Sequence, residues 1–235
     1  MSRNTVTAMD AKRANCYDPG RHNAMKTTSL FVILIALCST ALATGETRSV
    51  YGPQAPGNAA FVRLVNAIPG KTPLEIEIGA TRYAALGWAE VSPYRPVTPD
   101  IYQLEAAGNE AEIIAGSGRY YTVACTPTGI IVYEDPAHTD PARAQLFLYN
   151  LSSLPQIDLR TANGKSRVIS GVGPRSSGLA LVNAVRVPLA VFSEGTSIAG
   201  LGDLGLERGS SFSVFVLAGN QAPVVFAVRA RVAVE

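Results

Sequence analysis

The sequence predicts an all-β protein of two tandem small antiparallel β-sandwich domains, with immunoglobulin-like and jelly-roll-like topologies as open alternatives. The first observation is a series of short apolar runs, rich in Val, Ile and aromatic residues, that 21 glycines and 15 prolines interrupt. The second is that no segment keeps an apolar period of about 3.6 residues long enough for a substantial helix. The third is a phrase that the chain repeats.

The repeated phrase reads as a strand followed by a turn. Residues 61–67 (Phe-Val-Arg-Leu-Val-Asn-Ala) return as residues 179–184 (Leu-Ala-Leu-Val-Asn-Ala), and a Pro-Leu pair follows each copy. We expect each copy to form the first strand and turn of one domain. Residues 145–151 (Gln-Leu-Phe-Leu-Tyr-Asn-Leu) are a third, looser echo. Further matches follow in the same order, namely residues 118–123 with 209–214 and residues 130–133 with 223–226.

Two segments predict particular strands. Residues 74–78 (Leu-Glu-Ile-Glu-Ile) alternate strictly between apolar and acidic, as a strand with one wet face does. Residues 156–160 and 167–170 flank the pair Asn163-Gly164, which tolerates positive φ angles. This pattern predicts a β-hairpin closed by a type I′ turn.

The N-terminal residues 1–43 have the pattern of a secretion signal. A charged start at Met25-Lys26 precedes the apolar residues 30–37, and a small-x-small site predicts cleavage after Ala43. Met25 is an alternative start of the chain. The apolar run is shorter than the about 20 residues that span a bilayer, so we expect no membrane span in the mature chain.

The mature chain divides by composition into four parts. Residues 44–58 are rich in Gly and Pro and form an extended leader, and residues 135–142 contain two Asp-Pro pairs that predict a linker. The linker separates an N-terminal β-sandwich over residues 59–134 from a C-terminal β-sandwich over residues 143–235.

The charge of the mature chain is close to zero. Five of the 20 Lys and Arg residues and two of the 18 acidic residues precede residue 44, which leaves 15 basic and 16 acidic side chains. The basic character belongs to the signal region, so the sequence does not predict nucleic-acid binding.

The mature chain offers few residues for catalysis. Cys16 and Cys38 precede the predicted cut, and Cys125 lies in an apolar run where a buried thiol is expected. His138 is the only histidine after residue 43, and it lies in the linker, where a solvated side chain is the favoured interpretation. We predict no catalytic, cofactor-binding or metal site. The linker carboxylates, as a calcium site, are the weaker alternative.

Five side chains are candidates for contact with a partner or a glycan. Trp88, Tyr94 and Arg95 lie in one loop-like run, where exposed aromatic rings can stack on sugars or anchor a protein. Arg63 and Arg186, near the repeated phrases, can face a partner carboxylate. The alternatives are that the aromatic residues close the end of the sandwich and that the arginines are solvent-facing strand charges.

Four segments resemble the AlgF family of alginate O-acetylation proteins. They are residues 51–56, 60–67, 140–151 and 159–164, and residues 140–151 (Asp-Pro-Ala-Arg-Ala-Gln-Leu-Phe-Leu-Tyr-Asn-Leu) are the most specific. The resemblance covers nearly all of the mature chain. The first half also resembles an extracellular immunoglobulin-like domain.

The resemblance implies a periplasmic protein required for O-acetylation of the exopolysaccharide alginate. It implies a non-catalytic adaptor whose partners are a periplasmic and a membrane-anchored alginate O-acetyltransferase. The alternative is a carbohydrate-binding module that presents alginate to those enzymes. An enzyme that uses His138 as its base is the third hypothesis.

Overall fold

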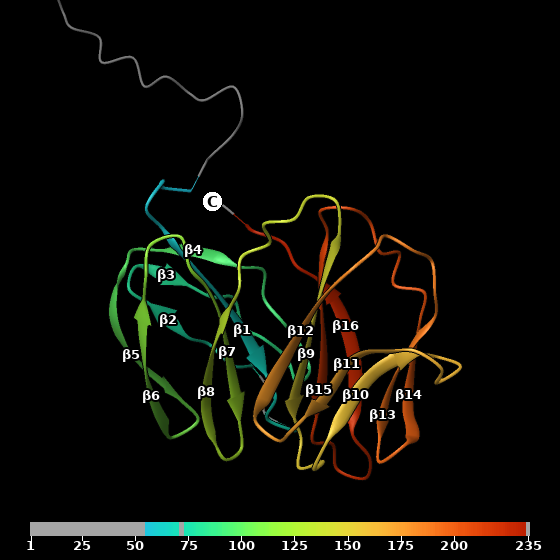
Figure 1. The fold of residues 1–235 in the computed structure, drawn as a ribbon. Helices are drawn as coiled ribbons and strands as arrows, with labels where there is room; N and C mark the ends of the chain where they lie inside the picture. Colours follow the sequence, from blue (N-terminus) through green and yellow to red (C-terminus); the bar gives the residue numbers. More distant parts are fainter. Residues whose placement is uncertain (1–54, 71–72, 234–235) are drawn as a thin grey trace, which may run out of the picture. The chain divides into compact units, whose positions relative to one another are not determined.

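The computed structural model describes residues 55–70 and 73–233. These residues form sixteen β-strands in five sheets, and no α-helix occurs in the described ranges (Figure 1). Each half has its own apolar core, which confirms the all-β class and the two tandem domains. The predicted signal region 1–43, with Met25 and the cut after Ala43, lies outside the described residues, as does most of the leader 44–58.

The first domain is built on a four-stranded sheet. Its strands lie in the order β4 (Arg95–Val97), β1 (Ala60–Asn66), β7 (Tyr120–Thr126) and β8 (Gly129–Asp135). Two hairpins pack against one face of this sheet: β2 (Glu77–Ile78) with β3 (Thr81–Arg82), and β5 (Asp100–Ala106) with β6 (Asn109–Ala115). The apolar side chains between them form the first core.

The alternating segment 74–78 behaves as the sequence predicts. Leu74, Ile76 and Ile78 are buried in the first core, whereas Glu75 and Glu77 are exposed. Water on one face of this segment and apolar side chains on the other explain the pattern. The strand itself is short, because only the last two of these residues pair with β3.

The second domain contains two four-stranded sheets. One has the order β12 (Ser176–Val182), β9 (Ala144–Leu151), β15 (Ser211–Leu217) and β16 (Val224–Arg229). The other has the order β11 (Arg167–Val172), β10 (Ile157–Thr161), β13 (Leu189–Ser193) and β14 (Thr196–Gly202). The second core fills the space between these two sheets.

The sheets β4-β1-β7-β8 and β12-β9-β15-β16 share one arrangement. β1 pairs antiparallel with β4 and parallel with β7, and β9 pairs antiparallel with β12 and parallel with β15. Asn66 is the last residue of β1 and Asn150 the last but one of β9, and both are fully buried. Each side chain accepts a hydrogen bond from the backbone N–H two residues later, at Ile68 and Ser152. Both asparagines therefore stabilise the turn that follows their strand.

The match between the domains corrects one prediction. Residues 179–182 of the repeated phrase lie in β12, an edge strand that corresponds to β4, so they do not form the first strand of the second domain. That position belongs to β9, which contains the looser echo at residues 145–151. The downstream matches are confirmed, because β7 corresponds to β15 and β8 to β16.

The central strand pairs also differ from the antiparallel sheets that the sequence predicts. β1 runs parallel to β7, and β9 runs parallel to β15. Between β1 and β7, and between β9 and β15, the chain forms the strands of the covering layer and one edge strand (β4 or β12), and it then re-enters the sheet at the end from which it started. A crossover of this kind makes neighbouring strands parallel, whereas a tight hairpin makes them antiparallel.

The hairpin predicted around Asn163-Gly164 is present, but its turn differs. β10 pairs antiparallel with β11, and the N–H of Gly164 donates to the carbonyl of Thr161 at 2.7 Å. Gly164 has a φ of 72°, whereas Asn163 is not among the residues with positive φ. The type I′ turn is therefore wrong, because that turn needs positive φ at both central residues. Positive φ at both central residues does occur in two other hairpins, at Ala107-Gly108 between β5 and β6 and at Glu194-Gly195 between β13 and β14.

The two matched sheets face each other across a third apolar cluster. Val65, Ala124 and Tyr133 of the first domain belong to this cluster together with Tyr149 and Phe215 of the second, and the ring centres of Tyr133 and Tyr149 lie 5.2 Å apart. Both faces of β9 are therefore covered, which explains why all eight of its residues are buried.

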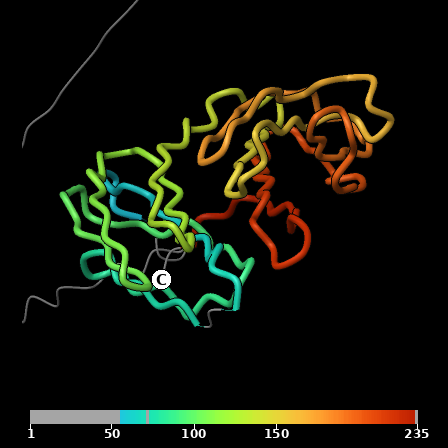
Figure 2. Tube along the Cα trace, turned by 90° about the horizontal axis from the view of Figure 1, so that it is seen from below, coloured from blue at the N-terminus to red at the C-terminus, as the bar shows by residue number. Residues whose placement is uncertain are grey.

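The C-terminal segment connects the two domains through its backbone. After β16 it returns to the first domain, where the N–H of Tyr94 donates to the carbonyl of Arg231 at 2.8 Å. The N–H of Ala233 donates to the carbonyl of Tyr94 at 2.9 Å. Figure 2 shows this segment, in red, running from the yellow and orange domain to the blue and green one.

Candidate functional site

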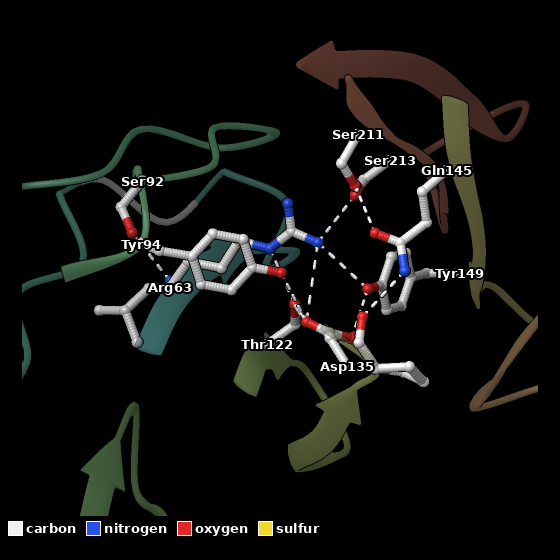
Figure 3. Close-up of polar contacts among 11 residues, drawn as sticks. Arg63, Ser92, Tyr94, Thr122, Asp135, Gln145, Tyr149, Ser211 and Ser213 are labelled. Atoms are coloured by element: carbon white, nitrogen blue, oxygen red, sulfur yellow. Dashed lines mark hydrogen bonds and ion pairs between the residues drawn. The ribbon is translucent and has the colours of Figure 1, made fainter. Parts of the chain in front are cut away.

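Arg63 places a charged group between the two facing sheets. It lies in the middle of β1, a strand whose two faces are both buried, and only 1% of its surface is exposed. Its Nε donates to Thr122 Oγ1 at 2.8 Å, and its Nη2 donates to Tyr149 OH at 3.1 Å and Ser213 Oγ at 2.8 Å (Figure 3). The guanidinium group of one domain is thus bound by hydroxyl groups of both domains.

Asp135 supplies the opposite charge at the end of β8. Its Oδ2 lies 3.9 Å from Arg63 Nη2, so the two groups form an ion pair without a direct short contact. Its oxygens accept hydrogen bonds from Tyr94 OH at 2.7 Å, from Tyr149 OH at 2.5 Å and from Thr122 Oγ1. Thr122 and Tyr149 therefore link the cation to the anion, since each accepts from Arg63 and donates to Asp135. We call these five residues (Arg63, Tyr94, Thr122, Asp135 and Tyr149), together with Ser213, the Arg63 cluster.

Aromatic rings surround the guanidinium group of Arg63. Its Cζ lies 4.5 Å from the ring centre of Tyr94 and 5.4 Å from that of Phe215, within the range of cation–π attraction. Burial raises the pKa of the Tyr94 and Tyr149 phenols well above the usual value of 10.0. Both phenols therefore keep their protons at neutral pH and remain donors to Asp135.

A cleft of about 300 Å³ opens beside the Arg63 cluster. Tyr94 and Asp135 contribute to its wall, together with Tyr120, His138, Phe147, Arg229 and Arg231. The His138 side chain is partly buried, and its Nε2 atom has no hydrogen-bond partner among the described residues. The solvated histidine expected from the sequence is therefore wrong. Pro136 and Ala137, which follow β8 directly, also line the cleft.

The hydroxyl groups of the cleft bond to acceptors of the fold. Ser210 Oγ donates to the carbonyl of Glu207 at 2.6 Å, and Ser211 Oγ donates to Gln145 Oε1 at 3.0 Å. Gln145 in turn donates to the carbonyl of Pro136 at 2.9 Å. These bonds hold the cleft wall in place, and none of them joins a serine to His138.

The edge strand β12 exposes two leucines beside this cleft. Leu179 is 42% exposed and Leu181 is 40% exposed. Leu179 pairs across the sheet with Phe147, and Leu181 pairs with Gln145, and both partners line the cleft. Cross-strand partners share one face of a sheet, so the leucines lie on the same face as these two cleft residues. We call Leu179, Leu181 and the cleft the edge surface.

The five predicted contact residues fall in different environments. Arg63 and Tyr94 are buried in the Arg63 cluster, and the alternative of a solvent-facing strand charge is wrong for Arg63. Trp88 and Arg95 are partly buried, and Arg95 Nη1 donates to the carbonyl of Arg82 at 2.6 Å. Arg186 is exposed in the segment after β12.

The sequence reasoning missed the partners of Arg63. Thr122, Asp135, Tyr149 and Ser213 come from four other strands, and the separation from Arg63 along the chain runs from 59 residues for Thr122 to 150 for Ser213. One signal was available, because an arginine inside an otherwise apolar strand needs a buried acceptor or anion. Cys125 was predicted correctly as a buried residue, and burial raises the pKa of its thiol to about 12.

The described residues contain neither a candidate membrane span nor a candidate metal cluster. No helix in the described ranges is long and apolar enough to cross a membrane. Within the same ranges, no group of three or more His, Cys, Asp or Glu residues gathers in a way that could hold a metal ion.

The fold and the edge surface define a class of two-domain β-sandwich protein with a charged cluster between its central sheets. Comparison of sequences then gives the family. The family described as "Alginate O-acetyl transferase AlgF" matches residues 32–213. The chain belongs to the AlgF family.

Individual relatives agree with this assignment. The alginate biosynthesis protein AlgF of Pseudomonas aeruginosa is 30% identical over 185 residues, which cover 77% of this chain and 84% of that protein. The protein of the same name from Pseudomonas putida is 28% identical over 197 residues, or 83% of this chain and 90% of that protein. The Azotobacter vinelandii protein is 26% identical, over 78% of this chain and 84% of that protein.

Two solved domain structures are also similar. The C-terminal domain of AlgF from P. aeruginosa is 31% identical, with a TM-score of 0.35, and the match covers 37% of this chain and 98% of that domain. The N-terminal domain of the same protein is 26% identical, with a TM-score of 0.31, and the match covers 35% of this chain and all of that domain.

Proposed function

We propose that this chain is a periplasmic, non-catalytic adaptor required for O-acetylation of alginate. It mediates contacts between a periplasmic and a membrane-anchored alginate O-acetyltransferase. Membership of the AlgF family supports the place in alginate biosynthesis. The secretion pattern in residues 1–43 supports the periplasmic location.

The observation that carries the contact role is the edge surface. Leu179 and Leu181 expose large apolar side chains on the same face as the cleft residue Phe147. Apolar surface that remains open to water next to a cleft is typical of a protein interaction site. An adaptor must present such a surface, whereas an enzyme of this family would need an activated nucleophile.

The chemistry of the cleft favours binding over acetyl transfer. The Ser210 and Ser211 hydroxyl groups donate to acceptors of the fold. The Cys125 thiol is buried, and its pKa is raised to about 12, which suppresses the reactive thiolate. A nucleophile for acyl transfer needs a neighbouring base or a lowered pKa.

A gene deletion tests the function directly. We expect a bacterium without this chain to make alginate polymer that lacks O-acetyl groups, and a plasmid copy of the gene to restore them. The O-acetyl content of purified alginate, measured by proton NMR, gives the answer. Normal acetylation in the deletion strain would contradict the proposal.

The adaptor role needs a second measurement, because an enzyme would give the same deletion result. We expect the purified mature chain to transfer no acetyl group to polymannuronate by itself, from any acetyl donor supplied. We also expect it to form a complex with a purified acetyltransferase partner in calorimetry. Acetyl transfer by the chain alone would favour an enzyme instead.

A further inference from the structure

Unlike the other strands at sheet edges, β12 has no feature that prevents a strand of another chain from pairing with it. β4 contains Pro96, β8 contains the exposed Glu134, and β16 ends on Arg229. β11 and β14 pair with register shifts. Proteins use charge, proline and bulges in this way to keep edge strands from pairing with other chains.

β12 has none of these features over its whole length. Its residues 176–182 (Ser-Ser-Gly-Leu-Ala-Leu-Val) contain no charge and no proline. All seven pair with β9 without a register shift, and among the described strands β9 is the one with which β12 pairs. The outer edge of β12 therefore presents a regular row of backbone donors and acceptors.

We propose that β12 takes an extended segment of a partner protein as an added strand. The inference rests on the proposed adaptor function and specifies how the partner binds. The backbone of the segment would hydrogen-bond to the outer edge of β12, about 4.8 Å away. Alternate side chains of the segment would cover Leu179 and Leu181, whose exposure would then fall.

The surroundings of the edge define the chemistry of the segment. Phe147 and Gln145, the cross-strand partners of the two leucines, line the cleft, so the cleft lies on the same face of the sheet as Leu179 and Leu181. Arg231 lines the cleft and is exposed, and Arg229 lines it while pairing with Glu207 at 2.9 Å. The buried Asp135 is already neutralised by Arg63. This charge distribution favours a segment with alternating apolar residues and a carboxylate near the cleft.

Hydrogen exchange of backbone amides tests strand addition with the wild-type chain. The probe is the periplasmic acetyltransferase of the same bacterium, purified and mixed with the mature chain at a concentration where calorimetry shows a complex. Amides on an outer strand edge exchange quickly until a partner strand pairs with them. We expect exchange in residues 176–182 to slow by about tenfold or more in the complex, whereas the β5–β6 hairpin remains unchanged.

The outcomes separate this inference from the proposed function. A complex that leaves exchange in β12 unchanged would overturn the strand addition and leave the adaptor function standing. No complex at all would overturn both. Exchange in β12 could also be slow without the partner and become slower as the concentration of the chain rises. That result would show that a second copy of the chain occupies the edge, and it would also overturn the inference.

A pair of variants with matched controls tests the same edge by affinity. Leu179→Lys with Leu181→Lys adds two charges to the exposed face without changing the buried side chains. We expect the affinity for the acetyltransferase to fall at least about tenfold while the melting temperature stays the same. The control is Ile101→Lys with Ile114→Lys, which face each other on β5–β6 and are 58% and 65% exposed. Equal losses of affinity in both double variants would contradict a specific role for β12.

Discussion

Thr122 and Ser213 occupy matched positions in the two domains, and both accept a hydrogen bond from the guanidinium group of Arg63. Thr122 pairs with Arg63 across the first central sheet, and Ser213 pairs with Phe147 across the second. Both bonds measure 2.8 Å. Phe147 stands where the symmetry would place a second arginine, so the interface holds one cation and needs only one anion, Asp135.

We predict that loss of the Arg63 charge destabilises the protein strongly. Arg63→Met would leave Asp135 buried without its cation, and breaking a buried pair in this way costs about 3–5 kcal/mol. Urea unfolding followed by tyrosine fluorescence and circular dichroism measures the change in the free energy of unfolding.

The control for this substitution is Arg82→Met. Arg82 pairs with Glu75 and Glu77 at 3.4 Å on the surface, where both partners are well exposed. Exposed pairs contribute at most about 1 kcal/mol, so the midpoint of unfolding should hardly move. Similar losses of stability in the two variants would show that the buried pair is no more important than a surface pair.

Stability should fall at alkaline pH. Burial raises the pKa of Tyr94 and Tyr149 in the folded protein above the usual 10.0, whereas the unfolded chain has the usual value. The unfolded state therefore loses these protons first, and stability is complete below pH 10 and decreases above it. Each phenol contributes a slope of about 1.4 kcal/mol per pH unit there.

The measurement is the free energy of unfolding at several pH values between 8 and 11. Tyr149→Phe removes one titrating phenol, so its curve should be flatter than the wild-type curve above pH 10. The slope is compared, because the loss of two hydrogen bonds lowers the stability of this variant at every pH. Curves of unfolding free energy against pH that run parallel for the two proteins would contradict a raised pKa of Tyr149 in the folded state.

Cys125 should react slowly in the folded protein. The thiol is buried, and burial raises its pKa to about 12, so little thiolate forms at pH 8. In a chain that begins at residue 44, Cys125 is the only cysteine, and reaction with Ellman's reagent reports on it alone. We expect complete reaction only in denaturant. Rapid labelling of the native chain would mean that β7 opens readily to solvent.

His138→Ala distinguishes the adaptor from the enzyme hypothesis. Because Nε2 of His138 has no hydrogen-bond partner among the described residues, its removal should cost little stability. We expect a strain with this variant still to acetylate alginate, with at most the partial loss that follows from changing one side chain of the cleft wall. Loss of acetylation with the protein still folded and abundant would favour His138 as a catalytic base.

The sequence predicts the fold class better than the order of strands within it. Short apolar runs and the alternation in residues 74–78 report local burial, and the structure agrees with them. The prediction that residues 179–184 form the first strand of the second domain was wrong because an edge strand and a first strand can share a few apolar residues and an asparagine. Only the pairing of β9 with β15 reveals that residues 145–151 take the place of β1.

The candidate site was harder to predict because its parts are distant in the chain. Arg63 is separated from Tyr149 and Ser213 by 86 and 150 residues, and no local pattern links them. The edge surface depends on the absence of a neighbour beside β12, which is a property of the sheet order. Leu179 and Leu181 read as ordinary strand residues until that order is known.

Alginate acetylation in living cells tests the central claim that the edge surface makes this chain an adaptor. The deletion strain is given the gene with Leu179→Lys and Leu181→Lys, or the control with Ile101→Lys and Ile114→Lys, and the amount of folded protein is verified in each. We predict that the O-acetyl content stays at the deletion level with the β12 variant and returns to the wild-type level with the control. Full acetylation with the β12 variant would contradict the claim.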